Sequence, residues 1–214
     1  MPMNFDIFMK VSGFTFDPRT FEKILLGNNK LASCLTAHLA LERFLEAWIC
    51  AYTGIEDLFI NDHKNKDKIH FSMNFLSKAK LSQRMGLPLN AYKIIEKLNS
   101  IRNSFAHQHD YEGASHQIFL SIINDIDKLP AYHQKALSND DYTVFIDDGK
   151  TQQKHVLSSE SCPHELRYSA ITYGLLVRCL HYMINELPLV QPKANSQDQL
   201  SYGIYSVRYK STIV

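Results

Sequence analysis

The segment from Lys30 to Tyr52 constrains the fold most, because its apolar residues have the spacing of one long α-helix. One stripe recurs at intervals of three and four residues, at Leu31, Leu35, His38, Leu41, Leu45, Trp48 and Tyr52. A second stripe holds small residues around Phe44, namely Ala37, Ala40, Ala47 and Ala51. Small residues let another helix approach closely, so the sequence predicts a helix at the centre of a bundle. Thr53-Gly54 is expected to end it.

The rest of the chain predicts a mainly α protein, a helical bundle over 28–187 with a small β-hairpin and β-prone terminal segments. Further helices are expected over 71–85, from a capping Asn90 to Ala106, over 115–129, and from Pro163 to 187. A hairpin insertion is expected near 142–157, because two β-prone segments flank the turn-like Asp147-Asp148-Gly149-Lys150.

Residues 1–27 and 188–214 are expected to flank the bundle. The first region is predicted to be a lead-in with an extended or strand segment over 5–16 and a short helix over 21–26. The C-terminal tail is polar and then β-prone, so it is a candidate to pair with the N-terminal strand or with a partner.

Composition excludes several classes of protein. The 23 Lys and Arg residues against 22 Asp and Glu leave a formal charge of +1, so duplex-DNA binding by bulk charge is not expected. No apolar run approaches the roughly 20 residues that span a bilayer, and the N-terminus lacks the features of a signal peptide. The four cysteines form no C-x-x-C pair and are expected to be buried, reduced thiols. A cytoplasmic protein without membrane contact is predicted.

One stretch of the helix ending near Ala106 carries residues suited to chemistry. Ile94, Leu98, Ile101 and Phe105 form a narrow apolar stripe that must face the core. Asn99, Asn103 and His107 are four residues apart and align on the opposite face, with Arg102 on its flank. An imidazole can move protons and a guanidinium can hold phosphate oxygens, so the set suits phosphodiester chemistry. No clustered carboxylates accompany it, which argues against a two-metal nuclease.

The run Arg102-Asn103-Ser104-Phe105-Ala106-His107 resembles the R-x4–6-H motif of HEPN domains, whose common form has Asn after the Arg and a small residue before the His. The preceding long helix with Glu42 and Glu46 also fits a HEPN bundle, and the resemblance covers about residues 28–130. It departs from one regulated subgroup, which has a modified Tyr two residues after the motif His. Here that position is His109, so regulation by that route is not expected.

The resemblance implies a metal-independent endoribonuclease that works as a homodimer and leaves a 2′,3′-cyclic phosphate. HEPN enzymes are often toxins or antiviral-defence effectors, so RNA is the expected substrate and an antitoxin or inhibitor protein is a candidate partner. Arg102 and His107 would be catalytic and Asn103 would support them, with Asn99, Glu42, Glu46 and His109 as further support. One of the two glutamates is expected to orient Arg102. No cofactor or metal is expected.

Two other interpretations of the same residues stay open. Arg102 and His107 can simply favour the end of a helix, where cationic side chains interact well with the helix dipole. A HEPN-like bundle can also use the motif without catalysis, as a nucleotide-binding, regulatory or protein-interaction module. His38 and Glu42 are spaced to bind a metal, but a hydrogen-bonded histidine in the core is the preferred interpretation of His38.

Overall fold

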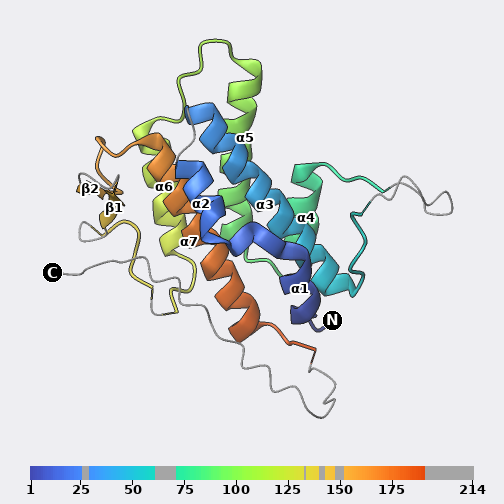
Figure 1. Ribbon diagram of the computed structural model, residues 1–214. Coiled ribbons are helices and arrows are strands. Elements are labelled where there is room, and N and C mark those ends of the chain that lie inside the picture. The colour runs from blue at the N-terminus through green and yellow to red at the C-terminus, as the bar shows by residue number, and fades with distance from the viewer. Residues whose placement is uncertain (26–28, 61–70, 133, 140–142, 148–151, 191–214) are drawn as a thin grey trace.

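The computed structural model describes residues 1–25, 29–60, 71–132, 134–139, 143–147 and 152–190. Within these ranges the chain is mainly helical, as predicted. The elements are α1 (Phe5–Ser12), a 3₁₀ helix η1 (Gly13–Phe16), α2 (Pro18–Leu25), α3 (Lys30–Thr53), α4 (Phe75–Arg84), α5 (Leu89–His107), α6 (His116–Asp127), β1 (Thr143–Asp147), β2 (Gln152–Val156) and α7 (His164–Glu186) (Figure 1).

The long helix α3 lies at the centre of the bundle, where α1, α2, α4, α5 and α7 all pack against it (Figure 1). Its start is capped by Asn29, whose side chain accepts a hydrogen bond from the Ala32 N–H at 2.8 Å. Gly54 ends it with a φ of 75°, a left-handed conformation that glycine adopts without strain. The small-residue stripe is buried as predicted, and Trp48 beside it is fully buried.

The apolar stripe of α5 faces the core as predicted. Ile94, Leu98 and Ile101 are buried, and Phe105 is half-buried at the stripe's end. The helix begins at Leu89 after Pro88, and no side chain caps it, so the expected capping by Asn90 is wrong. Pro88 is the cap residue, so the helix begins two residues earlier than a capping Asn90 would place it.

The N-terminal region is helical, so the strand predicted over 5–16 is wrong. Asn4 caps α1 by accepting a hydrogen bond from the Ile7 N–H at 3.1 Å. Phe8 is fully buried and meets Phe44 of α3 edge-on, with ring centroids 5.7 Å apart. The alternation of apolar and polar residues in this segment fits a strand or a helix, and the packing of Phe8 on α3 together with the asparagine cap favours the helix.

The predicted hairpin is present, since β1 and β2 pair antiparallel with Thr143 opposite Val156. Its turn, the charged segment 61–70 and the β-prone part of the tail lie outside the described residues. The four cysteines are buried and free, as predicted. Among the described helices, none is long and apolar enough to cross a membrane.

Candidate functional site

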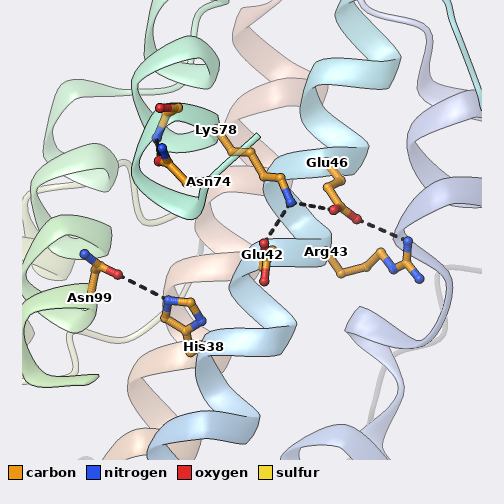
Figure 2. A network of polar contacts seen from close by, with 8 residues as sticks. His38, Glu42, Arg43, Glu46, Asn74, Lys78 and Asn99 are labelled. Carbon is orange, nitrogen blue, oxygen red and sulfur yellow. Dashed lines mark hydrogen bonds and ion pairs between the residues drawn. The ribbon is translucent and has the colours of Figure 1, made fainter. Parts of the chain in front are cut away.

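The antiparallel helices α3 and α5 carry most of the predicted site residues. The start of α3 lies beside the end of α5, because Lys30 Nζ donates to the backbone oxygen of Glu112 at 3.0 Å. About two turns along α3, His38 Nε2 lies 3.3 Å from Asn99 Oδ1 (Figure 2). Asn99 therefore faces α3, and Asn103, one turn further along α5, shares its face.

Arg102 and Asn103 are brought together at this face. Both side chains are half-buried, and Arg102 Nη1 donates to Asn103 Oδ1 at 3.2 Å. The guanidinium is close enough to α3 that its charge acts on the pKa values of Cys34 and His38. A fixed positive charge thus lies at the boundary of the two helices.

His107 and His109 point into solvent instead. His107 is the last residue of α5, it is exposed, and its side chain has no hydrogen-bond partner within the described ranges. His109 lies two residues beyond the helix, also exposed. The structure therefore joins Arg102 to Asn103 and Asn99 to His38, and it leaves the motif histidine free to meet a ligand.

His38 is a satisfied, half-buried histidine, as preferred from the sequence, but it also adjoins the motif. Its ring stacks on Phe75 with centroids 3.9 Å apart, and it is hydrogen-bonded to Asn99. Burial lowers its pKa, and the charges of Arg102 and Lys78 act in the same direction against the opposing effects of Asn99 and Glu42. With the amide oxygen of Asn99 as acceptor, the neutral ring donates from Nε2 and holds that amide in place.

Glu42 and Glu46 bind a different cation from the one predicted. Lys78 of α4, whose side chain is only 6% exposed, donates to Glu42 Oε1 at 2.8 Å and to Glu46 Oε1 at 2.7 Å (Figure 2). Glu46 also pairs with Arg43 at 3.2 Å. Both carboxylates therefore anchor α4 on α3, which corrects the expectation that one of them orients Arg102. The sequence did not reveal Lys78, because no local pattern relates it to residues more than 30 positions earlier.

An apolar stripe on α3 is exposed beside the motif. Leu31 and Leu35 are each 39% exposed and Leu39 is 64% exposed. They are four residues apart, so they follow one face of the helix. Leu35 is one turn from His38, which contacts Asn99 of α5. Leu41, Leu45 and Trp48, further along the apolar stripe predicted for α3, are buried, so exposure is confined to the first turns of that stripe.

An open hollow of about 680 Å³ lies at the end of α5. It lies between the start of α3, the loop after His107 and the start of α7, with Phe105 and Tyr111 on its wall. The rings of these two residues meet edge-on with centroids 4.7 Å apart. His109, predicted as a supporting residue, lines this hollow and lies beyond the α3–α5 contact.

The last two turns of α5 carry three side chains with useful chemistry. His107 supplies an accessible imidazole for proton transfer, Arg102 supplies a positive charge for an anion, and Asn103 holds the guanidinium. Among the described residues, no three His, Cys, Asp or Glu side chains are grouped so that they could hold a metal ion.

What the chain does must be inferred from these side chains. The structure brings the guanidinium of Arg102 and the amide of Asn103 together, and the exposed imidazole of His107 follows one turn beyond Asn103 at the end of α5. No protein-family model matches this sequence, and no curated protein or solved structure matches it either.

Proposed function

We propose that this protein is a homodimeric, metal-independent endoribonuclease of the HEPN type. The observation that carries the proposal is the Arg102–Asn103 pair at the boundary of α3 and α5, with the exposed His107 one turn beyond Asn103 at the end of α5 and the exposed leucine stripe of α3 beside them. The resemblance of residues 102–107 to the HEPN motif supports the same conclusion.

In the proposed reaction, the 2′-oxygen of a ribose attacks the adjacent phosphorus and the bond from phosphorus to the 5′-oxygen breaks. One His107 takes the proton from the 2′-hydroxyl, and a second imidazole gives a proton to the departing 5′-oxygen. Arg102 stabilises the negative charge that grows on the non-bridging phosphate oxygens. The products are a 2′,3′-cyclic phosphate and a 5′-hydroxyl.

A dimer supplies the second imidazole. Each copy has one His107 at the end of α5, and the stripe Leu31, Leu35 and Leu39 offers an apolar surface next to it. Two copies related by a two-fold axis would bury the same stripe on each side. The two motifs would then face each other, with acid and base contributed by different copies.

The test is cleavage of total RNA in excess EDTA by the wild type and by His107→Ala. We expect the variant to lose about 100-fold or more in rate, which is the usual contribution of a positioned proton-transfer group. Gln117→Ala, an exposed polar change on α6, is the control and should cleave like the wild type. Equal cleavage by the wild type and His107→Ala would refute the proposed role of the histidine.

One observation favours a non-catalytic role for the motif as the second candidate. Arg102 is half-buried and already donates to Asn103, as a structural arginine would. In a purely structural role, Arg102→Lys would lower the melting temperature and leave any RNA cleavage by the folded protein unchanged. In the catalytic role, the same variant would lose cleavage while remaining folded.

A further inference from the structure

The hollow at the end of α5 has the size and the wall of a binding site for a planar ring. Its volume of about 680 Å³ is within the range of small-molecule sites. Phe105 and Tyr111 are both half-buried and hold each other in an edge-on arrangement. Rings fixed in this way lose little freedom when a flat ligand stacks on them.

The charges around the hollow disfavour a phosphate. Glu112 and Glu165 contribute two carboxylates and Lys30 one ammonium, so their formal sum is −1 with His109 neutral. The Lys30 ammonium is already hydrogen-bonded to the backbone oxygen of Glu112. Carboxylates favour a neutral ligand that carries N–H donors, as Glu and Asp do when they accept from the amino group of cytosine. The side chain of Gln108 adds an amide that can both donate and accept.

The hollow also adjoins the proposed reaction centre. Gln108 and His109, which line it, directly follow His107 at the end of the helix. A chain held with its phosphate at His107 would therefore bring a neighbouring base to the hollow.

We infer that this hollow is a nucleobase subsite, in which a base near the scissile phosphate stacks on Tyr111, whose ring Phe105 holds edge-on, and Glu112 and Glu165 select a base with an exocyclic amino group. This inference rests on the proposed ribonuclease function. It predicts a preference for cytosine over uracil, two bases of equal size that differ in the amino group.

The test compares the wild type with Glu112→Gln/Glu165→Gln, Tyr111→Leu and a control, Glu22→Gln, an exposed change on α2. A random RNA pool is digested in EDTA and the fragment ends are sequenced. We expect the wild type and the control to prefer cytosine over uracil at one position beside the cut by about fivefold or more, which corresponds to one good polar contact. The double Gln variant should still cleave and should lose this preference. Tyr111→Leu should lower kcat/KM at cytosine sites by about 5- to 100-fold, the range expected for loss of base stacking.

A binding experiment distinguishes failure of the proposed subsite from failure of the proposed ribonuclease function. Fluorescent 2′-O-methyl octamers of cytosine and of uracil cannot be cleaved, and their binding is measured by anisotropy in EDTA. If the wild type cleaves no RNA but binds the cytosine octamer more tightly, and the double Gln variant does not, the subsite stands and the catalytic proposal fails. Cleavage with no preference in the wild type, or a preference unchanged in the double Gln variant, would overturn the subsite and leave the nuclease intact. Equal binding of both octamers by an inactive wild type would overturn both.

Discussion

At the scale of single residues, the Lys78 ammonium is a buried charge held by two carboxylates. It is almost fully buried between α4 and α3, bonded to Glu42 and Glu46, and 5.2 Å from the centre of the Phe59 ring. Burial lowers its pKa, but the bonds to the two carboxylates outweigh that effect and the net shift is upward. Lys78 therefore stays charged at neutral pH and holds two carboxylates that would otherwise repel each other.

We expect Lys78→Met to destabilise the fold strongly, because it leaves both carboxylates without their cation. Breaking a buried ion pair costs about 3–5 kcal/mol, and the partial exposure of Glu42 reduces this to about 2 kcal/mol. The control is Lys97→Met, which removes the more exposed pair between Lys97 and Asp125 that joins α5 to α6. It should cost less than about 1 kcal/mol. If urea denaturation gave equal losses of unfolding free energy for Lys78→Met and Lys97→Met, the Lys78 ion pairs would contribute no more stability than the exposed pair.

His38 should make stability depend on pH. Its pKa is lowered in the folded protein, chiefly by burial, from an ordinary value of 6.5. Below about pH 6.5 the unfolded chain takes up a proton that the folded chain resists, so the stability from the neutral ring is present above that pH and lost as the pH falls through the folded pKa. Burial lowers the pKa of His164 as well, so this residue acts in the same direction.

The measurement is the free energy of unfolding of the wild type and His38→Gln between about pH 7.5 and 5.5. As the pH is lowered, the free energy of unfolding should fall less steeply for the variant than for the wild type, because the variant retains only the contribution of His164 and the remaining groups. Parallel curves would contradict the assigned environment of His38.

The alignment of side chains along one helix could be predicted from the sequence, but their partners on other helices could not. The alignment of Asn99, Asn103 and His107 on one face follows from helix geometry, and the Arg102–Asn103 bond adjoins it. Which cation meets Glu42 and Glu46 depends on α4, a separate helix brought in by tertiary packing. The spacing of residues along α3 does not indicate a partner on another helix.

At the scale of elements, α3 shows both the success and the limit of periodicity. Its bounds were predicted within one residue, because the apolar spacing begins near Lys30 and Gly54 is a strong end signal. The burial of its first turns could not be predicted, because apolar residues surround most of the helix. The alanines allow close helix approach and are buried, and the leucines at 31, 35 and 39 stay exposed. Only the arrangement of the five neighbouring helices decides which apolar residues of α3 are covered.

The exposed stripe gives a prediction about assembly. We expect the wild type to have twice the 24.7 kDa mass of the chain in solution, and Leu35→Glu/Leu39→Glu to be monomeric, because buried charges disfavour an apolar interface. Leu89→Glu is the control, since Leu89 is 54% exposed at the opposite end of α5 from the motif. Light scattering after size exclusion measures all three. A monomeric wild type, or a double variant that remains dimeric, would contradict the interface.

At the scale of the whole molecule, the core joins segments from both ends of the chain. Met3 pairs with the segment after α7, donating to the Pro188 oxygen at 2.7 Å and accepting from the Val190 N–H at 2.8 Å. Phe21 of α2 meets Tyr173 of α7 edge-on. The N-terminal region is therefore part of the bundle and not a lead-in to it. The sequence could not show this, because the contacts join residues more than 150 positions apart.

The buried thiols provide a report on global unfolding. Burial raises the pKa of Cys34 and of Cys50 to about 11, and it raises the pKa of Cys162 and Cys179 as well. A thiol reacts as the thiolate, so all four should react slowly with a disulfide reagent in native protein at neutral pH and rapidly in denaturant. Fast reaction of one thiol in native protein would show that its part of the bundle opens locally.

The chemistry of the cut ends tests the central claim most directly. RNA treated with the wild type in excess EDTA should yield fragments that end in a 2′,3′-cyclic phosphate and begin with a 5′-hydroxyl, and His107→Ala should yield none. Intact RNA after treatment with folded, dimeric wild type, or fragments that begin with a 5′-phosphate, would contradict cleavage by the α3–α5 face.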